Sequence, residues 1–171
     1  MKKREIEIVK GDILQSDARF ILQQCNNKGI MGAGLAKEIK KDLAEEEFQK
    51  YVDLCKSENA LGKIVILKSK NNFKRRYINL IAQDSFGYNK RKVYTKYDCF
   101  ESALTRFLSI LKYTASLTPD VNYEVAIPYK IGCGLANGDW NEILRLFNLA
   151  YNSLESYPNV IFKIYQLEGV E

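Results

Sequence analysis

Two glycine-rich stretches hold the residues whose types and spacing could bind a charged ligand. Residues 24–36 (QCNNKGIMGAGLA) leave an apolar run and enter a segment with helical periodicity. Residues 126–140 (AIPYKIGCGLANGDW) repeat that order far downstream. Glycine lets the backbone approach a phosphate closely, and the N–H groups at a helix start attract negative charge. Two such stretches in one short chain predict a single ligand that is held from two sides.

Neither stretch has the sequence of a common nucleotide-binding loop. The glycines are not followed by Lys-Ser or Lys-Thr, and the chain has no Gly-x-Gly-x-x-Gly fingerprint. We therefore expect a nucleotide diphosphate that is bound by backbone amides, without an obligatory metal or cofactor. The alternative is that the glycines only permit tight turns and close packing of helices.

The amino-acid composition limits the chemistry that these stretches could support. The chain has 171 residues and no histidine, and its 4 cysteines form no Cys-x-x-Cys pair. These facts exclude Ser-His-Asp and Cys-His catalysis, remove the commonest zinc ligand, and argue against a disulfide framework. Acid or base catalysis must therefore use Asp, Glu, Lys, Tyr, Cys or bound water, and we expect no metal site.

The charge and hydropathy patterns bear on partners and localisation. The formal net charge of +5 comes from 26 basic and 21 acidic residues that are scattered along the chain. Scattered charges favour an ordinary solvated surface, although a role in RNA binding, with its steep salt dependence, stays an alternative. No apolar run approaches the roughly 20 residues of a membrane span, and no signal peptide is visible. We expect a cytoplasmic monomer that binds no membrane.

Alternating strand and helix patterns must position the two glycine-rich stretches. The periodicity predicts strands at residues 5–9, 19–25, 63–67, 76–82, 123–127 and 160–167, and helices at 32–42, 45–56, 95–113 and from 139 to about 154. No repeat, linker or low-complexity segment divides residues 1–171, which predicts one domain. This order favours a three-layer α/β/α sandwich around a mixed sheet. Ligands of such sheets bind beyond the carboxyl ends of the strands.

Three side chains near these strand ends have both a structural and a functional interpretation. Asp12 directly follows the first strand, where it could be a turn or cap residue or could face a ligand. Asp139 and Glu142 have the spacing of a capping box, yet Asp139 is also the nearest candidate carboxylate for catalysis. Cys133 lies inside the second stretch without a base partner, so small size in a tight turn explains it.

Three ordered motifs together resemble the macrodomain family of ADP-ribose-binding modules. They are residues 9–13 (VKGDI), 26–36 (NNKGIMGAGLA) and 128–135 (PYKIGCGL). The match runs from the first strand to the last, and the agreement of three motifs makes it specific. The resemblance implies a single macrodomain whose partner is ADP-ribose or an ADP-ribosylated protein or nucleotide.

The resemblance also implies a role for each motif. Asp12 would accept a hydrogen bond from the adenine amino group, because a carboxylate is an acceptor that faces an N–H donor. The two glycine-rich stretches would enclose the diphosphate and the distal ribose, with Asn26 and Asn27 near the ribose hydroxyls. The ligand-binding residues implied in this way are Asp12, Ile13, Asn26, Asn27, Met31, Gly32, Ala33, Gly34, Leu35, Ile131, Gly132, Cys133, Gly134 and Leu135.

The sequence departs from the family at the positions that matter for catalysis. It most resembles the branch of terminal ADP-ribose glycohydrolases and ADP-ribose 1''-phosphate phosphatases. In the glycohydrolases a lysine after the fourth strand attacks the anomeric carbon, and an aspartate just after the second loop assists. Here Gln83 and Ala136 occupy those positions. An amide forms no Schiff base and an alanine moves no proton.

Two functions therefore stay open at the level of sequence. The first is hydrolysis of an ADP-ribosyl ester or of ADP-ribose 1''-phosphate through an ordered water, with Asn27, Gln83 and Asp139 as the candidate catalytic residues. The second is a non-catalytic reader of ADP-ribose or of ADP-ribosylated targets.

Overall fold

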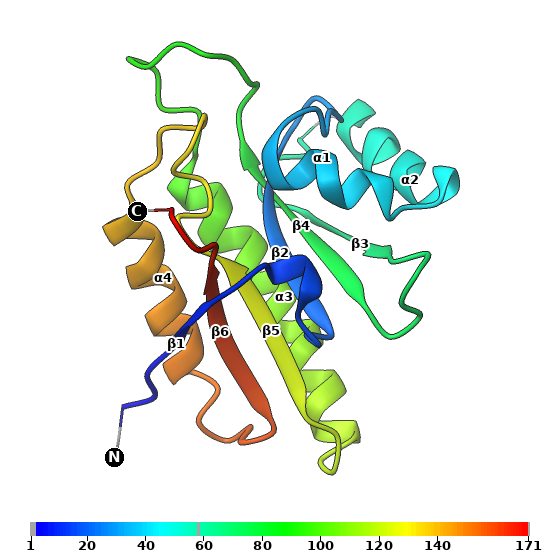
Figure 1. The fold of residues 1–171 in the computed structure, drawn as a ribbon, viewed down its shortest axis with the longest axis vertical. Helices are drawn as coiled ribbons and strands as arrows, with labels where there is room; N and C mark the ends of the chain where they lie inside the picture. Colours follow the sequence, from blue (N-terminus) through cyan, green and yellow to red (C-terminus); the bar gives the residue numbers. More distant parts are fainter. Residues whose placement is uncertain (1–2, 58, 171) are drawn as a thin grey trace.

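A mixed β-sheet forms the centre of the molecule. The structure is a computed structural model, and it describes residues 3–57 and 59–170. These residues form a six-stranded sheet of order β1-β6-β5-β2-β4-β3 (Figure 1), in which only β3 and β4 are antiparallel neighbours. The strands are β1 (Glu7–Lys10), β2 (Phe20–Asn26), β3 (Ile64–Lys68), β4 (Arg76–Gln83), β5 (Tyr123–Pro128) and β6 (Val160–Gln166). The predicted mixed sheet is confirmed.

Helices cover both faces of this sheet, as the alternating pattern predicts. They are the short 3-10 helix η1 (Ile13–Gln15) and the helices α1 (Gly34–Lys41), α2 (Glu45–Lys56), α3 (Tyr97–Leu117) and α4 (Trp140–Asn152). In Figure 1, α1 and α2 lie on one side of the sheet, and α3 and α4 lie on the other. The three-layer α/β/α arrangement is therefore confirmed.

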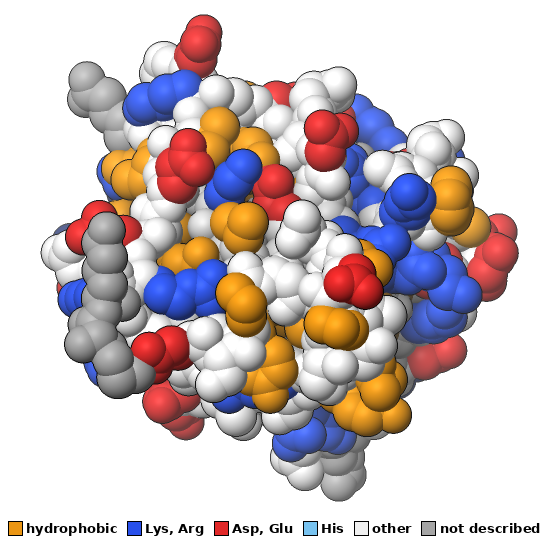
Figure 2. Space-filling model, turned by 90° about the horizontal axis from the view of Figure 1, so that it is seen from below, with side chains coloured by type: hydrophobic (Ala, Val, Ile, Leu, Met, Phe, Trp, Pro, Cys, Tyr) orange, Lys and Arg blue, Asp and Glu red, His pale blue; other side chains and the backbone are white. Residues whose placement is uncertain are grey.

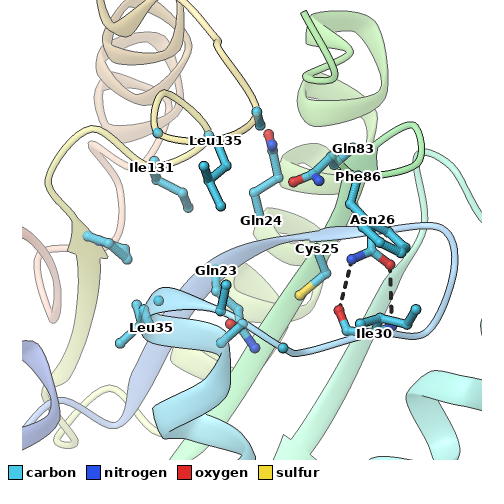
Figure 3. A pocket seen from close by; sticks show the side chains of 18 of the residues that line it. Gln23, Gln24, Cys25, Asn26, Ile30, Leu35, Gln83, Phe86, Ile131 and Leu135 are labelled. Carbon is cyan, nitrogen blue, oxygen red and sulfur yellow. Dashed lines mark hydrogen bonds between the residues drawn. The ribbon is translucent and has the colours of Figure 1, made fainter. Parts of the chain in front are cut away.

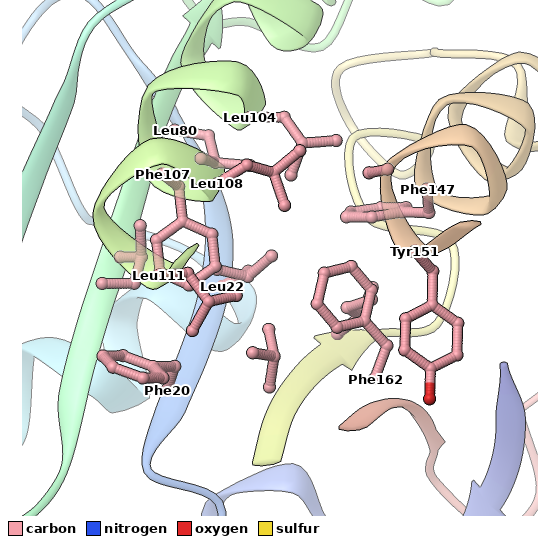
Figure 4. Close-up of a cluster of buried hydrophobic side chains, with 14 of the residues drawn as sticks. Phe20, Leu22, Leu80, Leu104, Phe107, Leu108, Leu111, Phe147, Tyr151 and Phe162 are labelled. Carbon is pink, nitrogen blue, oxygen red and sulfur yellow. The ribbon is translucent and has the colours of Figure 1, made fainter. Parts of the chain in front are cut away.

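Two packed clusters of apolar side chains hold the layers together. The larger one joins the sheet to α3 and α4, and Figure 4 shows Phe107 of α3 and Phe147 of α4 directed into it. The ring of Phe20 packs edge-on against Phe107 with 5.5 Å between the centroids. Each such buried ring contributes roughly 1.5–3 kcal/mol. The smaller cluster joins the opposite sheet face to α1 and α2.

Helix ends differ from the sequence-based expectation in instructive ways. Helix α3 continues past residue 113 to Leu117, because buried Ala115 extends its inner face while Tyr113 and Leu117 are exposed. Helix α4 ends at Asn152, and Leu154 is buried beyond it.

The predicted capping box at the start of α4 is wrong in one half. The carboxylate of Asp139 caps α4 by accepting from the backbone N–H of Asn141 at 2.9 Å, as expected for an N-cap. The backbone N–H of Asp139, however, donates to the hydroxyl of Tyr97 at 2.8 Å. Glu142 instead pairs with Arg145 at 2.8 Å. A tertiary partner from α3 therefore replaces the reciprocal bond of the box.

The surface and the helices give further general facts. Figure 2 views the molecule from below Figure 1 and shows basic and acidic side chains interspersed on that face. Within residues 3–57 and 59–170, no helix combines the length and the apolar character needed to cross a bilayer.

A register slip ends the pairing of β2 with β4. Cys25 lies opposite Ile81, but the next residue, Asn26, lies opposite Gln83. Ala82 is thus skipped, and its carbonyl accepts from the backbone N–H of Lys96 at 2.7 Å. Bulges of this kind re-aim side chains at the ends of strands, where sites form.

Candidate functional site

A cavity of about 450 Å³ opens at the carboxyl ends of β2, β4 and β5. This volume lies in the range of about 300–1,000 Å³ that is usual for small-molecule sites. Figure 3 shows side chains from both glycine-rich stretches around the same space. The lining residues are Gln23, Gln24, Cys25, Asn26, Ile30, Gly32, Ala33, Gly34, Leu35, Ala36, Gln83, Phe86, Gly87, Tyr88, Pro128, Tyr129, Lys130, Ile131, Gly132, Gly134, Leu135 and Ala136.

The first glycine loop (residues 27–33) is held by the side chain of Asn26, which is only 8% exposed. Its Oδ1 accepts from the backbone N–H groups of Lys28 and Ile30 at 2.9 and 3.3 Å, and its Nδ2 donates to the carbonyl of Ile30 at 2.8 Å (Figure 3). The hydroxyl of Tyr51 in α2 donates to the backbone carbonyl of Asn26 at 2.7 Å. Asn26 lines the cavity, but its polar atoms shape the loop.

The start of α1 presents unpaired N–H groups to the cavity. Ala33 is the N-cap residue and supplies no side-chain cap. Among the described residues, no acceptor binds the backbone N–H groups of Gly34, Leu35 and Ala36. Because all three residues line the cavity, the positive end of the helix dipole faces the same space. This arrangement suits an anion.

The second glycine loop (residues 129–138) forms the opposite wall. Its turns are closed by hydrogen bonds from the N–H of Cys133 to Lys130 O and from that of Gly138 to Gly132 O, both 2.9 Å. Gly132 has φ +75°, a conformation that favours glycine. A Cβ on Gly134 would meet no atom within 4 Å, so this residue borders open space.

This second loop also carries unpaired N–H groups. In residues 3–57 and 59–170, the backbone N–H groups of Gly134, Leu135 and Ala136 find no acceptor. All three residues line the cavity. Two sets of unpaired donors, one at the start of α1 and one in the second glycine loop, therefore border one space.

The segment after β4 closes the third side. Asn27 donates through Nδ2 to Asp84 at 3.2 Å and accepts from the backbone N–H of Ser85 at 2.8 Å. Gln83 donates through Nε2 to the carbonyl of Ser85 at 2.9 Å. Phe86 and Tyr88 then line the cavity mouth, with 48% and 80% of their surface exposed.

The predicted site residues divide into two groups. The cavity wall contains Asn26, Gly32, Ala33, Gly34, Leu35, Gln83, Ile131, Gly132, Gly134 and Leu135. Outside the wall lie Asp12, Ile13, Asn27, Met31, Cys133 and Asp139. Both glycine-rich stretches thus line the same cavity, as the sequence predicts. The roles of the individual residues stay predictions.

The segment that carries Asp12 and Ile13 has its own anchor. Asp12 is the N-cap of η1, and its Oδ1 accepts from the backbone N–H of Leu14 at 2.9 Å. The buried guanidinium of Arg75 donates to the carbonyl groups of Leu14 at 2.9 Å, of Ala18 at 3.4 Å and of Ser16. The turn after β1 is therefore fixed to the β3–β4 hairpin.

Cys133 in the second glycine loop and Asp139 directly after that loop both have surroundings that explain them structurally. Burial, and then the carboxylate of Asp139, raises the pKa of the Cys133 thiol to about 11. At neutral pH this thiol is protonated and is a weak nucleophile. Asp139 is exposed and caps α4.

Sequence reasoning missed several residues of the cavity wall, above all two glutamines in the buried strand β2. Gln23 donates through Nε2 to Asn79 Oδ1 at 2.6 Å, and Gln24 donates to the hydroxyl of Thr95 at 2.9 Å. Two adjacent polar residues inside an apolar strand were a usable signal, because buried amides need partners.

The cavity wall carries few charged side chains. Of the described lining residues, only Lys130 has a side chain that is charged at pH 7. Burial, and then Cys55, raises the pKa of the Cys25 thiol far above its ordinary value. No group of three or more Cys, Asp or Glu side chains within the described ranges could hold a metal ion.

Several solved structures with a similar backbone are macrodomains. The macrodomain of Mycobacterium tuberculosis DarG is 23% identical, with a TM-score of 0.73 over 94% of this chain and 97% of that chain. Thermosipho africanus DarTG in complex with ADP-ribose is 21% identical, with a TM-score of 0.70 over 99% of this chain and 43% of that chain. A protein of unknown function from Bacteroides thetaiotaomicron is 25% identical, with a TM-score of 0.69 over 96% and 99% of the two chains.

These likenesses fix the fold. No family model and no curated protein matches the sequence. The chain nevertheless has the macrodomain fold, as the three sequence motifs predict.

Proposed function

We propose that this chain binds ADP-ribose in the cavity between the two glycine loops. The observation that carries the proposal is the presence of two sets of unpaired backbone N–H groups on opposite walls of the cavity. One set belongs to residues 34–36 and the other to residues 134–136. A diphosphate between them would accept charge-assisted hydrogen bonds, each contributing roughly 1.5–3 kcal/mol. The complex of Thermosipho africanus DarTG with ADP-ribose, which shares this fold, supports the same ligand.

The adenine would lie toward the turn after β1. Asp12 uses Oδ1 to cap η1, which leaves Oδ2 to accept from the adenine amino group. Asp12→Asn keeps the cap, because asparagine is an equally good N-cap, but offers an amide in place of a carboxylate. We expect both Asp12→Asn and Asp12→Ala to weaken ADP-ribose binding by about 1–3 kcal/mol, and only Asp12→Ala to lower stability as well.

Hydrolysis of a bound ADP-ribose derivative is the second part of the proposal, and Gln83 supports it. A carbonyl oxygen can only accept, so the bond to Ser85 fixes Gln83 with Nε2 toward Ser85. Its Oε1 is left to accept a hydrogen bond from a water in the cavity. That water could attack an ADP-ribosyl ester or ADP-ribose 1''-phosphate. Asn27 would hold the segment after Gln83 in place through its hydrogen bonds to Asp84 and Ser85. A non-catalytic reader would bind the same ligands without turnover.

Calorimetric titration of the purified protein with ADP-ribose tests the binding proposal. Gly134→Glu should weaken binding at least about tenfold, because its carboxylate would enter the space that the diphosphate occupies. Ser109→Glu on the exposed face of α3 adds the same charge away from the cavity and should bind like the wild type. Absence of binding by the wild-type protein at millimolar ADP-ribose would overturn the proposal.

Product release separates the enzyme from the reader. Incubation with ADP-ribose 1''-phosphate and with an ADP-ribosylated protein should release phosphate or free ADP-ribose. Gly134→Glu should abolish this release. Tight binding with no release from either compound would favour the reader.

A further inference from the structure

Gln24 and Thr95 form a chain of hydrogen bonds that ends on the second glycine loop. Gln24 donates through Nε2 to the hydroxyl oxygen of Thr95 at 2.9 Å. The Thr95 hydroxyl donates to the carbonyl oxygen of Gly132 at 2.6 Å. Thr95 is 3% exposed, so water cannot easily replace these bonds. In Figure 3 the Gln24 side chain extends from β2 toward this loop.

The direction of this chain follows from the chemistry of its members. The carbonyl of Gly132 can only accept, so Thr95 must donate its single hydroxyl proton to it. The Thr95 oxygen must then accept from Gln24, which therefore presents its NH₂ group. The Oε1 of Gln24 is left without a hydrogen-bond partner in the described residues and packs against Gly132, where a Cβ would lie 2.7 Å away. Position 132 therefore requires glycine for two reasons. Its backbone φ is positive, and a Cβ would clash with Gln24.

The same carbonyl and the same threonine control the segment with the unpaired N–H groups. Gly132 O also accepts from the N–H of Gly138 at 2.9 Å, which closes the loop around residues 134–136. The backbone N–H of Thr95 donates to the carbonyl of Ala136 at 3.3 Å. Together with the backbone N–H of Tyr94, which donates to the same Ala136 carbonyl at 2.9 Å, Thr95 therefore holds this segment from both ends.

We propose that Gln24 and Thr95 are positioning residues that hold residues 134–136 in the conformation that binds the anionic part of the ligand. Neither side chain needs to touch the ligand for this role. The effect on affinity rests on the proposed ADP-ribose binding, whereas the effect on the loop does not. The two can therefore be measured separately.

Amide hydrogen exchange without ligand tests the effect on the loop. Thr95→Val has nearly the same shape but no hydroxyl, so the Gly138 amide should exchange at least about tenfold faster than in the wild type. Thr95→Ser restores the hydroxyl and should stay within about twofold of the wild type. Thr114→Val, which removes a hydroxyl bonded within α3, is the matched control and should change nothing at Gly138.

A second variant keeps the test decisive if Thr95→Val does not fold. Gln24→Met removes the donor while preserving length, and should also accelerate exchange at Gly138 but not in the core of β4. Unchanged exchange at Gly138 in the folded variants would overturn the proposal.

Titration with ADP-ribose then gives the functional consequence. We expect Thr95→Val to weaken binding at least about tenfold and Thr95→Ser to restore it. Faster loop exchange with unchanged affinity would overturn the positioning role. Failure of the wild type to bind ADP-ribose would instead overturn the proposed function and leave the exchange result standing.

Discussion

The two glycine loops border one cavity but are held in place by different means. The first is fixed by Asn26, its immediate neighbour, and by Tyr51 from α2. The second is fixed by Thr95 and Gln24, which are distant in sequence. The first loop is therefore held mainly by the residue directly before it, with further hydrogen bonds from Asn27 to Asp84 and Ser85 after β4. The second depends on the tertiary fold, so its conformation can be altered without disturbing its own residues.

The largest effect on stability should come from removing the local anchor. Asn26→Ala deletes hydrogen bonds to the backbone of Lys28 and Ile30 and leaves the Tyr51 hydroxyl with one acceptor fewer. We expect a loss of about 3 kcal/mol in the free energy of unfolding, measured by urea denaturation. Asn27→Ala, which removes bonds to Asp84 and Ser85 only, is the comparison and should cost less. Equal losses would mean that Asn26 is not the principal anchor.

The Tyr51 hydroxyl should have a smaller effect that depends on pH. Burial, and then Cys25 and Cys55, raises the pKa of Tyr51 above its usual value. The unfolded chain therefore releases this proton first, so the stabilisation is complete below about pH 10 and is lost as the pH rises beyond it. Tyr51→Phe should cost about 1 kcal/mol at pH 7 and should flatten the loss of stability above pH 10. An unchanged alkaline slope would contradict this account.

A still smaller change is expected just beyond the second loop. Asp139→Ala removes the N-cap of α4 and should lower stability by about 1 kcal/mol, whereas Asp139→Asn keeps the cap. Neither change should alter ADP-ribose affinity if the only role of Asp139 is to cap α4. Loss of turnover in Asp139→Asn, with stability retained, would instead identify the carboxylate as catalytic.

The smallest effect is expected inside the second loop. Cys133→Ala should change ADP-ribose affinity by less than about twofold, because its thiol makes only a weak hydrogen bond, to the carbonyl of Ile131 at 3.3 Å, whereas Thr95 holds the loop through Gly132. The raised pKa of about 11 also predicts slow alkylation of Cys133 by iodoacetamide at pH 7, with faster reaction as the pH rises. Titration with ADP-ribose measures the affinity, and mass spectrometry of the labelled protein measures the alkylation of Cys133 at each pH. Rapid labelling at pH 7 would contradict the burial of the thiol.

The sequence allowed much of the fold to be predicted because the relevant signals are local. Strand and helix periodicities lie within single segments, and β2 and β5 are parallel neighbours whose carboxyl ends meet at one edge. The glycine stretches that follow them therefore border the same cavity. Asp12 and Asp139 were likewise readable as caps, and both are N-caps in the structure.

The missed features are those that need a partner far along the chain. Gln24 is bonded to a threonine 71 residues away, and no periodicity connects the two. Likewise, the hydroxyl of Tyr97, from α3, accepts from the backbone N–H of Asp139, which the capping box predicted to bond to Glu142. Local spacing predicts which residues cap or turn, but it cannot predict which distant hydroxyl competes for a donor.

The position of β2 in the sheet has a consequence for which length changes the protein can tolerate. Successive side chains of β2 point to opposite faces of the sheet. Gln24 donates a hydrogen bond to Thr95, whereas Cys25 packs in the apolar cluster under α2. Adding or deleting one residue within this strand would reverse every later side chain and would separate both glycine loops from their anchors at once. Natural variants of this protein should therefore vary in length at surface turns and never within β2.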